Sequence, residues 1–179
     1  MVLIKLKICA IDAQKSLRGH NDMKNRYLVL CTISCAIVIL DQISKFLIVT
    51  NLQLGEHIVV IQNFFHITRN HNTGAAFGIL RNAPDILRLT LLLSLPIIAV
   101  VIILNILKTV SDKWRVTALA LIMGGAVGNF IDRLRLQHVV DFLDFFYQQW
   151  HYPAFNIADS SICVGFGMWL IYLIRQTKK

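Results

Sequence analysis

The stretch ILRLTLLLSLPIIAVVIILNIL, from Ile86 to Leu107, is almost entirely apolar and contains a single charged residue, Arg88. A helix rises about 1.5 Å per residue, so a stretch of this length can cross the hydrocarbon core of a bilayer, which is roughly 30 Å thick. Pro96 lies inside it, and a membrane helix tolerates proline because neighbouring helices satisfy the freed carbonyl. The stretch predicts a transmembrane helix, with Pro84 marking its start.

Three other stretches are similarly apolar, at about residues 27–49, 114–130 and 157–174. The chain has 179 residues, of which 56% are hydrophobic and 16% are charged, and its mean hydropathy is +0.61. These values are too apolar for an ordinary soluble domain of this length. We therefore expect a single integral membrane domain with four transmembrane helices.

The chain has a net charge of +8. Its Lys and Arg residues flank the apolar stretches and do not form the basic face that a nucleic-acid partner would require. Twelve of these residues lie with the two termini and the loop between the second and third stretches, against five on the other side. Short cytoplasmic segments carry the excess of positive charge. Both termini are therefore predicted to be cytoplasmic, with the two longer loops facing outward.

The N-terminal segment contains a short apolar patch, MVLIKLKICAI, which is too short to span a membrane and lacks a small-residue cleavage site. Met23, with Lys24 and Arg26 after it, resembles a second translation start. We expect residues 1–22 to be a dispensable extension and residues 23–179 to form the membrane domain.

The outward segment HIVVIQNFFHITRNHNTGAAFGIL, from His57 to Leu80, is β-branched and aromatic at first and then rich in Asn and Gly. It predicts strands and a short interfacial helix that lie on the membrane surface as a cradle or lid; a plain connecting loop is the alternative. The predicted fold is an all-α integral membrane protein. It has four transmembrane helices, a small extracytoplasmic β-rich cradle and an interfacial helix.

Polar residues in three of the predicted helices fall at similar depths. Asp41, Asn129, Asp132 and Asp159 all lie about 21–27 Å from the cytoplasmic ends of their helices. Charged groups at such depth cost a few kcal/mol unless they are paired or face a polar cavity, and by default they mark a functional site. The sequence therefore predicts a polar site near the outer face of the membrane.

A purely structural role is the alternative for each of these polar residues. Asp41 and Lys45 are four residues apart on one helical face and could form an ion pair. Asn129, Asp132 and Arg133 share a face as well, where a polar clamp and a chemical role are both possible.

Two further segments, HVVDFLDFF and FNIADSS, carry Asp141 and Asp159 near the outer interface. Asn156 lies one turn before Asp159, and an Asp at a helix N-terminus is commonly a cap. Chemistry alone does not separate Asp141 from Asp132 as the partner of Asp159. The histidines lack metal-ligand spacing such as HExxH, so we expect no metal and no cofactor.

Five segments, taken together, resemble the lipoprotein signal peptidase (type II signal peptidase) family. They are DQISK from Asp41, NTGAAFG from Asn72, GNFIDR around Asn129, VVDF around Asp141 and FNIADS from Phe155. Each is a weak signal alone, but their order and spacing are specific, and the resemblance extends from about Met23 to Arg175.

This resemblance implies an intramembrane aspartyl endopeptidase of the bacterial cytoplasmic (inner) membrane. It implies removal of the signal peptide from diacylglyceryl-modified prolipoproteins just before the lipid-modified cysteine. Asp141 and Asp159 would be the catalytic dyad, with Asp132 as the alternative to Asp141. The supporting or substrate-binding residues would be Asp41, Lys45, Asn72, Gly74, Asn129, Asp132, Arg133, Asn156 and Ala158.

Prolipoprotein substrates and membrane lipids are the partners that the resemblance implies, and we expect a monomer. A small polytopic transporter with intramembrane carboxylates is the alternative function. A transporter of that kind should show repeats with broken helices around a midplane site, and no such repeat is evident in the sequence.

Overall fold

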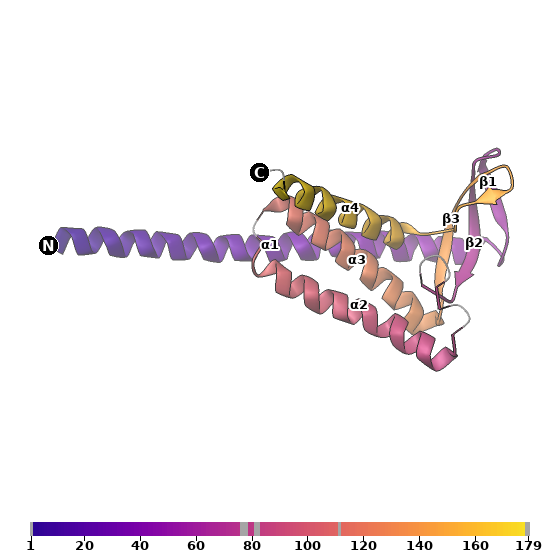
Figure 1. The fold of residues 1–179 in the computed structure, drawn as a ribbon, viewed down its shortest axis with the longest axis horizontal. Helices are drawn as coiled ribbons and strands as arrows, with labels where there is room; N and C mark the ends of the chain where they lie inside the picture. Colours follow the sequence, from indigo (N-terminus) through magenta and orange to yellow (C-terminus); the bar gives the residue numbers. More distant parts are fainter. Residues whose placement is uncertain (1, 76–78, 81–82, 111, 178–179) are drawn as a thin grey trace.

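The computed structural model of the chain describes residues 2–75, 79–80, 83–110 and 112–177, with side chains from residue 25 onward. The helices are α1 (Val2–Asn51), α2 (Asp85–Leu107), α3 (Lys113–Leu136) and α4 (Ile157–Thr177). The strands are β1 (His57–Ile61), β2 (Phe65–Asn72), β3 (Val139–Tyr147) and β4 (Trp150–His151). The helices run along one direction, and the sheet stands across one end of them (Figure 1).

Four helices in the described part of the chain are long and apolar enough to cross a membrane, as the four apolar stretches of the sequence predicted. They are Asn25–Asn51, Asp85–Leu107, Lys113–Leu136 and Ile157–Thr177. Pro84 caps the start of α2, as predicted. The N-terminal half of α1 continues back to Val2 and projects beyond the other helices (Figure 1).

Helix α3 is longer than the apolar stretch 114–130 from which it was predicted. Helix α3 continues to Leu136 and ends where Gln137 adopts a left-handed conformation with a φ of 63°. Apolarity falls after Phe130, but the helical backbone continues because Asp132 lies against neighbouring elements rather than in lipid. The fourth helix likewise ends at Thr177, beyond the predicted residue 174.

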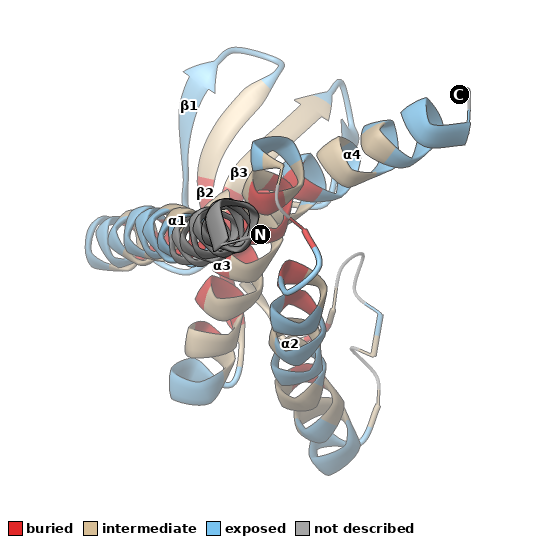
Figure 2. Cartoon of the chain, turned by 90° about the vertical axis from the view of Figure 1, so that its left-hand side faces the viewer, coloured by how far each residue is buried: buried red, intermediate tan, exposed pale blue. Residues whose placement is uncertain are grey.

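Helix α3 packs against each of the other three helices, and glycine permits its closest approaches. A Cβ atom on Gly124 would lie 2.8 Å from the Cβ atom of Ile37 in α1. One on Gly125 would lie 2.3 Å from the carbonyl oxygen of Ala158 in α4. Buried residues gather at these contacts, while the outer faces of the helices are exposed (Figure 2), as expected for surfaces that face lipid.

The strands form one antiparallel sheet in the order β1-β2-β3-β4. The β-rich region predicted from His57 onward is thus present, and the molecule combines a sheet with the predicted helices. Sequence reasoning assigned no strand to Val139–Tyr147, although β3 pairs with β2 along most of its length.

The described residues between β2 and α2, which are 73–75, 79–80 and 83–84, include no helix. The remainder of the segment expected to form an interfacial helix, residues 76–78 and 81–82, lies outside the described residues.

Two arginines fasten the ends of the helices to other elements. Arg69 of β2 donates to the carbonyl oxygens of Val49 and Leu52 at 3.1 and 2.9 Å, so the sheet is held on the end of α1. At the opposite end of the bundle, Arg26 donates to the carbonyl oxygens of Leu107, Lys108 and Val110. Helix ends leave carbonyls unpaired, and these arginines satisfy them.

Candidate active site

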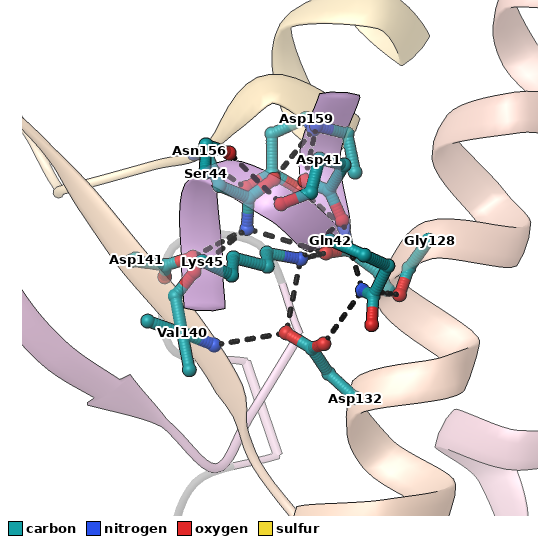
Figure 3. A network of polar contacts seen from close by, with 12 residues as sticks. Asp41, Gln42, Ser44, Lys45, Gly128, Asp132, Val140, Asp141, Asn156 and Asp159 are labelled. Carbon is teal, nitrogen blue, oxygen red and sulfur yellow. Dashed lines mark hydrogen bonds and ion pairs between the residues drawn. The ribbon is translucent and has the colours of Figure 1, made fainter. Parts of the chain in front are cut away.

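Lys45 is buried at the centre of a polar network between α1 and α3 (Figure 3). Its Nζ atom lies 2.8 Å from Asp41 Oδ2 and 2.9 Å from Asp132 Oδ2, and it donates to Asn129 Oδ1 at 3.0 Å. The ion pair considered for Asp41 and Lys45 is therefore present, and Lys45 forms a second ion pair with Asp132. A buried ammonium requires such a set of acceptors, because an unpaired charge in this position would be costly.

Both carboxylate oxygens of Asp132 are occupied. Gln42 donates to Oδ1 at 2.9 Å, and the backbone N–H of Val140 donates to Oδ2 at 3.2 Å. Sequence reasoning did not single out Gln42, although it lies inside the DQISK segment beside Asp41. Asp132 thus links α1, α3 and the start of β3.

The start of α4 is held by reciprocal hydrogen bonds between Asn156 and Asp159. The Asp159 N–H donates to Asn156 Oδ1 at 2.9 Å, and the Asn156 N–H donates to Asp159 Oδ2 at 3.3 Å. This is the arrangement of a capping box, which satisfies two unpaired backbone donors of a helix. The Ala158 N–H donates to Asp41 Oδ1 at 2.9 Å, which joins the same helix end to α1.

Asn156 also reaches the second carboxylate. Its Nδ2 donates to Asp141 Oδ1 at 2.7 Å and to the Val140 carbonyl at 3.3 Å. Burial and then the neighbouring Asp159 raise the pKa of Asp141 to about 7, against the smaller opposing effect of hydrogen bonds from Asn72 and Asn156. Two carboxyl groups that interact in this way do not both ionise readily.

Arg133 connects the third helix to the NTGAAFG segment. Its guanidinium donates to the Gly74 carbonyl at 3.1 Å and to the Asn129 carbonyl at 3.4 Å. The Gly74 N–H in turn donates to Asn72 Oδ1 at 3.0 Å. Asn72, Gly74 and Arg133 therefore lie together beside Asp141, while Ala76, Phe77 and Gly78 of this segment lie outside the described residues.

A cavity of about 1090 Å³ opens beside the two carboxylates. Its polar part includes Asp141 and Asp159, and its apolar part is formed by side chains of α2, α3 and α4. The apolar residues include Leu92, Leu95, Ile122, Ile162 and Phe166.

Asp41, Lys45 and Asp132 are not among the described residues that line this cavity, so they lie behind the site. In the described part of the chain, no group of three or more His, Cys, Asp or Glu residues is arranged to hold a metal ion.

Four bilayer-length helices, three of which line a cavity that holds two carboxylates, define a polytopic membrane protein with a polar site at one end of the bundle. Residues 33–175 match the sequence profile of the family described as Signal peptidase (SPase) II. The chain therefore belongs to the lipoprotein signal peptidase family, as the resemblance of its motifs predicted. Membership in this family makes it a peptidase.

Curated relatives and solved structures agree with this assignment. The chain is 44% identical to the lipoprotein signal peptidase of Bacillus pumilus over 147 residues, which are 82% of this chain and 93% of that protein. It is 39% identical to that of Syntrophus aciditrophicus over 159 residues, which are 88% of this chain and 99% of that protein.

Two solved structures, each described as a bacterial membrane enzyme determined by the in meso method, are 34% identical to the chain. The first has a TM-score of 0.74 and covers 83% of this chain and 88% of its own. The second has a TM-score of 0.70 and covers 80% of this chain and 91% of its own. The arrangement of four helices and a small sheet is thus that of a known bacterial membrane enzyme.

Proposed function

We propose that this peptidase is an intramembrane aspartyl endopeptidase. It removes the signal peptide from diacylglyceryl-modified prolipoproteins and cuts just before the lipid-modified cysteine. The observation that supports an aspartyl dyad is the position of Asn156, which hydrogen-bonds both Asp141 and Asp159 at the wall of one cavity. Asp132 is a poorer candidate because Lys45, Gln42 and Val140 occupy its oxygens.

The surroundings of the two carboxyl groups differ, and this difference assigns their roles. Each carboxyl group accepts hydrogen bonds, Asp159 from Asn129 and the Asn156 N–H and Asp141 from Asn156 Nδ2. Asp159 is half-buried and lies in the first turn of α4, where the helix dipole favours a negative charge. Asp141 lies on a strand and is more deeply buried, which favours its neutral form. Asp159 is then the base and Asp141 the acid.

The reaction follows from this assignment. Asp159 removes a proton from a water molecule as the water oxygen attacks the scissile carbonyl, and Asp141 donates its proton to the carbonyl oxygen. The C–N bond of the tetrahedral intermediate then breaks. Asp159 passes its proton to the leaving amine, and the carbonyl forms again as Asp141 recovers its proton.

The shape of the cavity fits the proposed substrate. The apolar surfaces of α2, α3 and α4 can hold acyl chains and an apolar signal peptide, while the carboxylates lie at the polar end. We place this end at the outer face of the cytoplasmic membrane, with both termini in the cytoplasm, because the excess of Lys and Arg lies on the side of the termini.

We further propose that residues 23–179 form the functional unit. Arg26, near the start of that range, already contacts the loop after α2, so the bundle is fastened within it. The preceding part of α1 projects away from the other helices (Figure 1).

Cleavage of a diacylglyceryl-modified prolipoprotein by the purified protein tests the function. We expect wild type to cut it, and the variants Asp141→Asn and Asp159→Asn to be folded but inactive, because the amide keeps the size and removes acid–base capacity. An active Asp141→Asn variant would refute the dyad. A wild type that cuts no lipid-modified substrate would favour the transporter instead.

A further inference from the structure

The pairing of β2 with β3 changes register beside the proposed dyad. Ile67 pairs with Leu143, and the next pair along the strands is Asn70 with Asp141. Strand β2 therefore advances three residues where β3 advances two, which makes a bulge in β2. Bulges of this kind occur next to active sites, where they turn a side chain to a different face.

The bulge decides which side chain lies opposite Asp141. With regular pairing after Ile67, the residue opposite Asp141 would be Arg69, which instead binds the end of α1. Residues directly opposite each other in an antiparallel pair point to the same face, with Cβ atoms about 5 Å apart. Asn70 is thus beside Asp141, on the same face as Asn72, whose side chain hydrogen-bonds Asp141.

The side chain of Asn70 is exposed and lines the cavity. Among the described residues it has no hydrogen-bond partner, whereas the carboxamides of Asn72, Asn129 and Asn156 all hold other parts of the site. An exposed amide with no structural partner, at the wall of a cavity and next to a carboxyl group, is available to a ligand.

We propose that the Asn70 carboxamide binds the substrate backbone, at a peptide group next to the scissile bond. This inference rests on the proposed peptidase function and adds a substrate-contacting residue to it. A peptide must be extended to reach a dyad, and its N–H and C=O groups then lose their helical partners in a site with little water. A carboxamide offers one acceptor and one donor group, and so matches one peptide unit.

The test combines a change in the enzyme with a change in the substrate. Asn70→Leu keeps a similar volume and removes both hydrogen-bonding groups. We expect kcat/KM to fall about 3- to 10-fold, the value of one neutral hydrogen bond, mainly through KM. A series of diacylglyceryl-modified substrates, each with an ester in place of one peptide group flanking the scissile bond, then locates the contact.

Each ester should lower kcat/KM relative to the normal substrate. For one of the esters this decrease should be smaller with Asn70→Leu than with wild type, because the variant already lacks the contact. Asn70→Gln, which retains the carboxamide, should recover part of the activity. Gln62→Leu, at an exposed amide in the turn between β1 and β2 and outside the cavity, should behave as wild type and controls for the added apolar surface.

Two results would overturn the role of Asn70. One is that the effects of Asn70→Leu and of the ester on kcat/KM are additive at every ester position, and the other is that folded Asn70→Leu has unchanged kinetics. The assay also separates this failure from failure of the proposed function. If wild type cuts the substrate and Asp141→Asn does not, the proposed peptidase function is supported whether or not Asn70 binds the substrate. If wild type cuts no substrate, both the peptidase function and the role of Asn70 are refuted.

Discussion

Asn129 donates a hydrogen bond of 2.7 Å from its side-chain Nδ2 to Asp159 Oδ1. The other end of the same carboxamide accepts from Lys45 at 3.0 Å. An ammonium group can only donate, so it fixes which end of the amide faces Asp159. The buried lysine therefore orients a group that contacts the proposed base, although it does not line the cavity.

Replacing Asn129 with alanine should lower kcat with little change in KM. Asp159 would lose a hydrogen bond to its charged form, which corresponds to a decrease of about 10- to 100-fold. Single-turnover kinetics on a diacylglyceryl-modified prolipoprotein would measure it. A change confined to KM would show instead that Asn129 acts in substrate binding.

Lys45→Met should destabilise the protein by about 3–5 kcal/mol, because it leaves Asp41 and Asp132 buried without their cation. Unfolding in detergent, followed by circular dichroism, would measure the loss. Adding Asp41→Asn and Asp132→Asn to the same variant should restore much of the stability, since no buried charge is then unpaired. A triple variant no more stable than Lys45→Met would contradict this explanation.

The activity should depend on pH through Asp141. Its pKa is raised to about 7, so the proton that the mechanism needs is present below that value and is lost above it. We expect kcat/KM to fall about tenfold per pH unit above this range. Thermal unfolding at each pH controls for loss of structure. A profile that stays flat to pH 9 would contradict the assignment of Asp141 as the acid.

Gly125→Ala should reduce both folded yield and activity. The added methyl group would lie 2.3 Å from the Ala158 carbonyl oxygen, so α4 would move and carry Asp159 with it. Such overpacking costs about 1–3 kcal/mol or more. Gly167→Ala is the matched control, because a Cβ atom there meets nothing within 4 Å. Equal melting temperatures for the two variants would contradict close packing of α3 on α4.

Deleting residues 1–22 should leave activity and stability unchanged, whereas deleting residues 1–26 should destabilise the protein. The longer deletion removes Arg26, which donates to three backbone carbonyls after α2, and we expect a loss of about 1–3 kcal/mol. Activity assays and melting curves of both truncated proteins would distinguish them. Loss of activity in the shorter deletion would refute the proposed unit 23–179.

The four helices could be predicted because each span needs a long apolar stretch, and the second, from Ile86 to Leu107, is visible by inspection. The end of α3 could not, because Asp132 and Arg133 break the apolar pattern but find partners in other elements. Hydropathy alone does not distinguish a helix that leaves the membrane from one whose polar residues are paired inside the protein.

Helical depth also predicted that Asp41, Asn129 and Asp159 lie near one another, since the rise per residue is fixed. The choice of Asp141 over Asp132 as the partner of Asp159 came only from the resemblance, because β3 is paired with a segment far away in the sequence. No sequence pattern indicated that Gln42 or Asn70 belongs to the site. The importance of Gln42 depends on which way α1 faces α3, and that of Asn70 on a bulge.

The backbone N–H of Ala158 is bound by Asp41, so the first and fourth helices meet at the site. A ribosome makes a chain from its N-terminal side, so α4 with Asp159 emerges after α1, α2 and α3. Until then, one proposed catalytic carboxylate and the asparagine that bridges the pair are missing. A nascent chain that still lacks α4 should consequently be harmless to other membrane proteins, and hydrolysis should begin only after α4 has been made and inserted.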